Sequence, residues 1–324
     1  ITASANHWLI AWFGLELNTL AILQMLTAPH TPRTTEAAIK YFLTQAAAST
    51  MLLLAGTMNA STTGQWDITQ LTTQPALTLL TMALMMKLGL APLHAWLPEV
   101  MQGTTTSMAL VLATWQKLAP FALLCMLMHS LHTPTIMTLA FLSTLVGGWG
   151  GLNQTQLRKL MAFSSIAHLG WATSMLTLNK SLALITLALY LSMTTTIFAT
   201  MITTNMKSLK DTTTTWYMLP PAMLLLLLTL ISLGGLPPTS GFLPKWLILK
   251  ELIFSNLHTI ATMMAIASLL SLMFYLRLTY LMSLTISPNT QTTKMKWRLT
   301  TKPNKLISMT TPLTLMLLPL TPML

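Results

Sequence analysis

The chain has 324 residues, of which 53% are hydrophobic and only 7% are charged. A soluble globular protein carries about 25% charged residues, so this composition excludes an ordinary water-soluble enzyme. The net charge of +11 does not indicate a nucleic-acid partner, because the basic residues are spread over loops and form no aromatic-flanked stripe. Cys125 is the single cysteine, which excludes an intrachain disulfide and a cysteine-ligated cluster.

Ten apolar runs predict membrane-spanning helices, each of which needs about 20 residues. In chain order they lie at 7–27, 37–58, 76–98, 105–129, 134–152, 160–178, 181–203, 218–254, 258–284 and 306–324. Strands of a membrane barrel alternate in polarity over about ten residues, and these runs do not. The sequence therefore predicts an all-α, polytopic membrane bundle of about ten spans, with 1–324 as a single membrane domain.

Basic residues fall mainly in the loops on one side of these spans. That side holds Arg33, Lys40, Arg158, Lys159, Lys207, Lys210 and the basic residues between 294 and 305, whereas the other side holds only Lys180 and Lys250. Loops rich in lysine and arginine stay on the cytoplasmic or matrix side of a membrane. We therefore expect the basic loops on that side and the C-terminus on the opposite, outer side.

A short internal repeat links the two halves of the chain. GLAPLHAWLP at 89–98 and GLPPTSGFLP at 235–244 share five residues at an offset of 146. Five predicted spans lie within this offset, and an odd number turns the second copy upside down. The run at 218–254 is too long for one span and is rich in glycine and proline, which predicts two half-helices. The pattern favours two inverted repeats, each with one interrupted helix, although a chance match of common membrane residues is the alternative.

Three prolines lie close to lysines in these runs. Proline lacks the N–H that would bond the carbonyl four residues earlier, so it exposes polar backbone. The carbonyls predicted to be freed are those of Leu88, Gln116 and Ser240, through Pro92, Pro120 and Pro244 respectively. The lysines that lie within five residues of these prolines are Lys87, Lys117 and Lys245. Each predicted break in a helix is therefore paired with a potential cation.

Glu16, Lys87 and Lys117 fall near the middle of their spans. The middle of a span is about 15 Å from either interface, beyond the reach of a lysine side chain. Each such charge costs about 2.5–3.5 kcal/mol to insert, so stability alone does not explain it. An ion pair between Glu16 and Lys87 that fixes helix register is one interpretation, but it leaves Lys117 and Lys245 unexplained.

A proton relay is the other interpretation. Lysine can take up and release a proton, whereas arginine stays protonated. Glu16 would act as a gate that holds Lys87 charged while the two are paired and lets it release a proton toward Lys117 when they separate. His168, at mid-span in AFSSIAHLGW, and His94, inside the interrupted third run, are each either relay groups or satisfied core histidines. No metal-binding or phosphate-binding motif accompanies them.

Six segments resemble a known family, the antiporter-like subunits of respiratory complex I. They are WLIAWFGLELNTLAI at 8–22, KYFLTQAAAS at 40–49, GQWDITQL at 64–71, MKLGLAPLHAWLPEV at 86–100, GLNQTQLRKLMAFSSIAHLGW at 151–171 and SLGGLPPTSGFLPKW at 232–246. The resemblance implies two inverted five-helix repeats with one interrupted helix each. The expected parts are 1–131, a first repeat that lacks its opening helix, 132–285, the second repeat, and 286–324, a basic loop and a C-terminal helix.

The resemblance also implies roles in proton translocation coupled to NADH oxidation and ubiquinone reduction. Glu16 matches the family's glutamate, Lys87 its paired lysine, Lys117 the central lysine and Lys245 the terminal residue on the second interrupted helix. FMN, the iron–sulfur clusters and ubiquinone are expected on other subunits and no cofactor on this chain. Expected partners are chains 4 and 4L, accessory subunits and lipids including cardiolipin, in the mitochondrial inner membrane. A free-standing cation/proton antiporter and a structural bridge between pump subunits are the alternatives.

Overall fold

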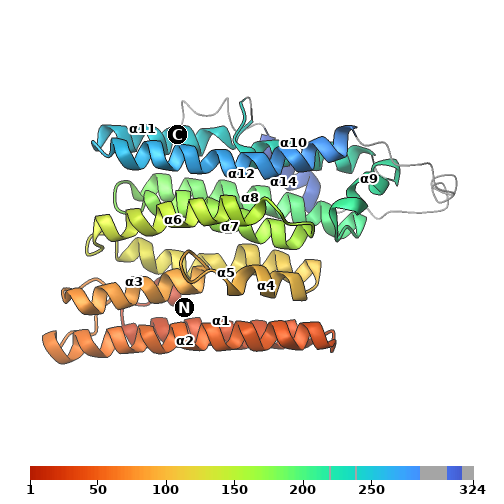
Figure 1. Cartoon of the computed structure of the whole chain (residues 1–324). Coiled ribbons are helices and arrows are strands. Elements are labelled where there is room, and N and C mark those ends of the chain that lie inside the picture. Colours follow the sequence, from red (N-terminus) through yellow and green to blue (C-terminus); the bar gives the residue numbers. More distant parts are fainter. Residues whose placement is uncertain (219, 238, 285–304, 316–324) are drawn as a thin grey trace.

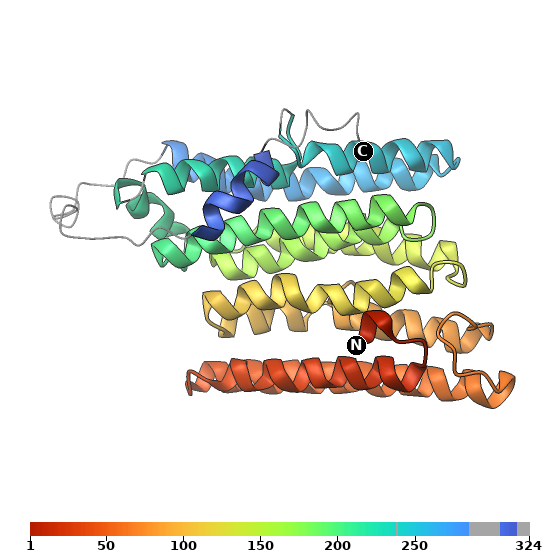
Figure 2. The same cartoon turned by 180° about the vertical axis from the view of Figure 1, so that it is seen from behind.

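The computed structural model describes residues 1–218, 220–237, 239–284 and 305–315. Near-parallel helices are stacked from α1 and α2 at one edge to α10, α11 and α12 at the other (Figure 1). The helices are α1 (Trp8–Thr27), α2 (Pro32–Thr63), α3 (Gln74–Leu88), α4 (Trp96–Gly103), α5 (Thr106–Met126), α6 (Thr133–Gly151), α7 (Leu157–Ser174), α8 (Lys180–Thr204), α9 (Leu209–Met218), α10 (Pro220–Gly234), α11 (Phe242–Phe254), α12 (His258–Leu284) and α14 (Lys305–Leu315), preceded by the short turn η1 (Thr2–Ser4). Seen from behind, α14 lies across α8 and α10 (Figure 2).

The helices confirm the prediction of an all-α membrane bundle. Five of them, α1, α2, α5, α8 and α12, are long and apolar enough to cross a membrane. The shorter α3 with α4, and α10 with α11, occupy the two runs that were expected to be interrupted. The count of ten spans stays a prediction, and the last predicted run, 306–324, lies partly outside the described residues.

The two interrupted helices end in the same local structure. Gly89 follows α3 with φ +75°, and Gly235 follows α10 with φ +78°. Glycine adopts this left-handed conformation at little cost, which is why it commonly terminates helices. The next amides bond back to the helix in both cases, Leu90 to Met85 at 2.9 Å and Leu236 to the carbonyl of residue 231 at 3.5 Å. These pairs share the offset of 146, whereas the inverted arrangement of two whole repeats stays a prediction.

Pro120 does not break its helix, so that prediction was wrong. α5 continues through it from Thr106 to Met126. No glycine with positive φ stands near Pro120, in contrast to Gly89 and Gly235 at the real breaks. A single proline is tolerated in a membrane helix that its neighbours hold in place.

The search for apolar runs missed the short helix α9. Its residues are too polar to resemble a span, and its first turn contains Asp211. The Asp211 carboxylate accepts the backbone N–H groups of Lys207 and Ser208 at 2.8 Å each. Partial burial opposes its charge, but the N–H donors of Ser208 and Lys207 hold the pKa of Asp211 below its usual value. This local bonding at the start of α9 is a capping signal rather than a hydrophobic one.

Glycines on α6 let it pack closely on two neighbours. A Cβ on Gly147 would lie 2.6 Å from the backbone nitrogen of Ala167 on α7. A Cβ on Gly148 would lie 3.2 Å from the carbonyl oxygen of Ala267 on α12. Small residues at such positions allow membrane helices to approach closely.

Gly147→Ala should therefore destabilise the bundle by about 1–3 kcal/mol, the usual cost of overpacking. Gly56→Ala is the matched control, because its Cβ would meet no atom closer than 3.7 Å. The thermal midpoint of the assembled complex is the measurement. An equal fall for both variants would contradict the packing argument.

Candidate functional site

Lys117 is fully buried beside the first interrupted helix. Its side chain is 1% exposed, and its Nζ donates a hydrogen bond to the carbonyl oxygen of Leu88, the last residue of α3. This is the carbonyl that was predicted to be free, but it is free because α3 ends before Gly89 and not because Pro92 interrupts the helix. The last carbonyls of a helix carry partial negative charge and attract a cation. The end of α3 thus provides a backbone hydrogen-bond acceptor for the Lys117 ammonium group.

Lys245 occupies a comparable place at the second interruption. Its Nζ donates to the carbonyl oxygen of Gly234 at 2.8 Å, and Gly234 is the last residue of α10. The freed carbonyl was predicted at Ser240, which is wrong, because Ser240 lies in the connecting turn and its carbonyl accepts the Leu243 N–H at 3.2 Å. Both lysines therefore rest on the C-terminal carbonyl of a half-helix.

Glu16 and Lys87 are close enough for their charges to interact through space. Within the described parts of the chain, however, they form no ion pair, and Glu16 Oε2 and Lys87 Nζ have no hydrogen-bond partner. Lys87 is only 3% exposed. Two buried opposite charges that do not touch need water to satisfy them. In this geometry the two charges are separated, and the gate stays a prediction.

Sequence reasoning missed a hydrogen-bonded network next to these charges. Gln116, which precedes Lys117, donates from Nε2 to the Tyr41 hydroxyl at 2.8 Å. Its Oε1 accepts from Asn18 Nδ2 at 3.1 Å. Tyr41 is itself within electrostatic reach of Glu16. Polar residues inside apolar runs were the signal that could have revealed this network.

His168 lies between two tyrosines near Lys245. Its Nε2 is 3.3 Å from the Tyr275 hydroxyl, and its ring stacks on Tyr190 with centroids 5.7 Å apart. A cavity of about 20 Å³, room for one water molecule, is lined by both His168 and Lys245. Tyr190 donates to the carbonyl of Ala113 at 3.2 Å, one helical turn before Lys117 on α5. Tyr190 thus joins the residues around His168 and Lys245 to the helix that carries Lys117.

Glu16, Lys117 and His168 lie where two apolar cores meet. One core contains Leu15, Leu88, Phe121, Leu169 and Ile248 toward one end of the helices. The other contains Ile22, Trp96, Ala113, Ile166 and Leu233 toward the other end. Glu16 therefore lies between core residues of both kinds on α1, as Lys117 does on α5 and His168 on α7. A polar layer thus crosses the bundle at mid-length.

His94 lies apart from this layer, in the loop between α3 and α4. Its Nδ1 is 3.2 Å from the carbonyl oxygen of Pro92. Among the described residues no contact joins His94 to Glu16, Lys87 or Lys117. A local loop contact accounts for its position.

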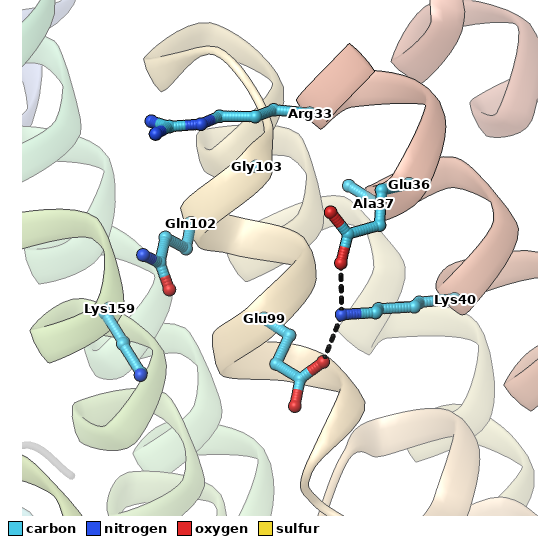
Figure 3. Close-up of a pocket in the computed structure, with 8 residues that line it drawn as sticks. All are labelled: Arg33, Glu36, Ala37, Lys40, Glu99, Gln102, Gly103 and Lys159. Carbon is cyan, nitrogen blue, oxygen red and sulfur yellow. Dashed lines mark ion pairs between the residues drawn. The ribbon is translucent and has the colours of Figure 1, made fainter.

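One end of the bundle carries a charged cavity of about 410 Å³ between α2, α4 and α7. Lys40 lies between Glu36, at 2.6 Å, and Glu99, at 2.8 Å, while Arg33 and Lys159 line the same cavity (Figure 3). These basic residues were predicted to share one side of the membrane, and they do share one end of the bundle. All three bridging side chains are well exposed.

Comparisons with known proteins agree with this architecture. Residues 5–271 match the family model described as NADH:quinone oxidoreductase/Mrp antiporter, TM, and 272–324 match NADH dehydrogenase subunit 2 C-terminus. NADH-ubiquinone oxidoreductase chain 2 of Tetraodon nigroviridis is 53% identical, covering 99% of this chain and 92% of the relative. The Xenopus laevis protein of the same name is 50% identical, covering 100% of this chain and 94% of its own length.

Solved structures share the fold. A chain of respiratory complex I from Thermus thermophilus is similar with a TM-score of 0.86 and 28% identity, covering 99% of this chain and 75% of that one. A chain of the Mrp complex from Dietzia sp. DQ12-45-1b gives a TM-score of 0.77 at 16% identity, covering 88% and 58%, and supports the fold alone. The family models and the relatives together show that this chain belongs to the NADH-ubiquinone oxidoreductase chain 2 family of antiporter-like membrane subunits of respiratory complex I.

Proposed function

We propose that this chain carries protons across the mitochondrial inner membrane as a core subunit of complex I, and that the polar layer is its path. The single observation that carries this proposal is the position of Lys117. Its side chain is fully buried, and its Nζ donates a hydrogen bond to the last carbonyl of the half-helix α3. Glu16 and Lys87 form one end of the relay and Lys245 the other. His168, with Tyr190 and Tyr275, lies along the connection, and a role for His94 stays a prediction.

The geometry suits proton transfer because each lysine can be held in place whether it is charged or neutral. The carbonyls of Leu88 and Gly234 accept hydrogen bonds from an ammonium or from a neutral amine, so either form of the lysine can be held. Arginine would remain protonated in both places. A change of charge at Glu16 and Lys87 then alters the electrostatic cost of a proton on Lys117, since charges interact strongly where water is scarce.

The energy for pumping must come from outside this chain. We propose that FMN, the iron–sulfur clusters and ubiquinone reside on other subunits and that no redox cofactor is bound here. Chains 4 and 4L, accessory subunits and lipids such as cardiolipin are the proposed neighbours. We place the charged end of the bundle in the matrix, because loops rich in lysine and arginine favour that side.

A free-standing cation/proton exchanger would share the same fold. Relatives about 50% identical over nearly the whole chain are named as oxidoreductase subunits, which favours the complex. Gentle solubilisation followed by sizing separates the two functions. The subunit should elute in a very large particle, and elution as a small oligomer would support the exchanger.

Ordered water is the feature that tests the relay most directly. We expect a high-resolution map of the complex to show waters that bond Glu16 Oε2, Lys87 Nζ and Gln45 Nε2, all buried and without partners among the described residues. Each such atom would otherwise carry the cost of an unmade hydrogen bond. Dry, apolar surroundings at these three atoms would instead favour a structural bridge that transports nothing.

A further inference from the structure

Tyr41 is held from two sides in the interior of the bundle. It is 0% exposed, and its hydroxyl accepts the Gln116 Nε2–H at 2.8 Å. Trp96 packs edge-on against its ring, with centroids 5.9 Å apart. The Trp96 indole N–H is itself fixed on the carbonyl of Met86, at 3.0 Å, near the end of α3. The tyrosine therefore cannot turn freely.

Gln116 has its orientation fixed by two different helices. Its oxygen accepts from Asn18 on α1, so its nitrogen must face Tyr41 on α2. A hydroxyl that accepts one hydrogen bond retains its own hydrogen for a second. In the part of the chain that the structure describes, no acceptor for the Tyr41 hydrogen is present. This buried donor requires a partner, because leaving it unpaired is costly.

The Glu16 carboxylate is a group that can accept this hydrogen. It is within electrostatic reach of Tyr41, and its Oε2 is buried without a partner among the described residues. The geometry points to Tyr41 as a positioning residue that directs its hydroxyl hydrogen to the Glu16 carboxylate through one water. This inference rests on the proposed relay. It gives the Glu16 carboxylate a hydrogen-bond donor that fixes its orientation relative to Lys87.

Few other groups can compete for Glu16. The helices around it contribute Tyr41 from α2 and Lys87 from α3, and Gln116 from α5 bonds to Asn18 on the same helix as Glu16. The turn η1, which also contacts α1, has no titratable side chain between Thr2 and Ser4. Gln116 is already satisfied by its two hydrogen bonds. The Tyr41 hydroxyl and Lys87 are therefore the groups expected to act on Glu16.

Tyr41→Phe tests the assignment because it keeps the ring against Trp96 and removes only the hydroxyl. We expect the acid side of the pH profile of NADH-driven proton pumping to move to higher pH by about one unit, a tenfold change in proton affinity. Gln116→Met should move it in the same direction, since Tyr41 is then no longer oriented. The double variant should shift no further than Tyr41→Phe, because both changes act through one hydroxyl.

Tyr280→Phe is the matched control, since Tyr280 is 63% exposed. The pH profile of pumping by this variant should not move. An unchanged profile in the assembled Tyr41→Phe complex would overturn the positioning role, and so would a loss of assembled complex whose remainder keeps the original profile. Pumping by Lys117→Ala distinguishes the two levels of the argument. If that variant pumps normally, the relay itself is wrong, whereas if it fails while Tyr41→Phe is unaffected, only the positioning role is wrong.

Discussion

Replacement of Lys117 by alanine should abolish most NADH-driven proton pumping while leaving the complex assembled. A positioned proton-transfer group contributes roughly a hundredfold or more to the rate, and Lys117 is fully buried. The Leu88 carbonyl would lose its charged donor, but a water molecule can take the vacated space. Proton uptake by sealed vesicles and NADH oxidation, both per assembled complex, are the measurements.

Lys117→Arg separates a relay from a structural cation. Arginine keeps a positive charge at the end of α3 but cannot release a proton at physiological pH. A purely electrostatic cap on Leu88 would tolerate this change, whereas a relay would fail as it does with alanine. Lys180→Ala is the matched control, because Lys180 is exposed at the start of α8. Pumping at the normal rate by either Lys117 variant would contradict the assigned role.

Much of the fold could be predicted because lipid imposes simple rules on sequence. Apolar runs located the long helices, and the glycine–proline segments after Leu88 and Gly234 located the two interruptions. These features depend on local residues, so pattern alone detects them. The helix α9 was missed since its start depends on Asp211 bonding to nearby amides, and Pro120 was misjudged since neighbouring helices decide whether a proline breaks a helix.

The site was only half predictable for a related reason. Mid-span charges such as Lys117 can be recognised from the sequence, because their insertion cost demands an explanation. Their partners cannot, since Tyr41 and Gln116 are 75 positions apart and meet only after the helices pack. The seat of Lys245 on Gly234 likewise depends on how α11 folds back on α10. Nothing in the sequence shows that Glu16 and Lys87 lie near each other without touching.

That separation leads to a second large effect, which a double variant should reveal. Glu16→Gln alone leaves Lys87 buried with no opposite charge, and Lys87→Met alone does the same to Glu16. Removing one of two buried opposite charges is destabilising even where they do not touch, because the remaining charge is left uncompensated. Combining Glu16→Gln with Lys87→Met removes both charges, so stability should return close to the original value.

Pumping should respond differently from stability in this set. A relay needs groups that exchange protons, so the double variant should assemble as a stable complex and still fail to pump. If the two charges served only to fix helix register, the double variant would recover both properties. Glu36→Gln with Lys40→Met is the matched control, because that ion pair is exposed to solvent and contributes little to stability. Thermal midpoints and proton uptake measured on all the single and double variants decide between the two outcomes.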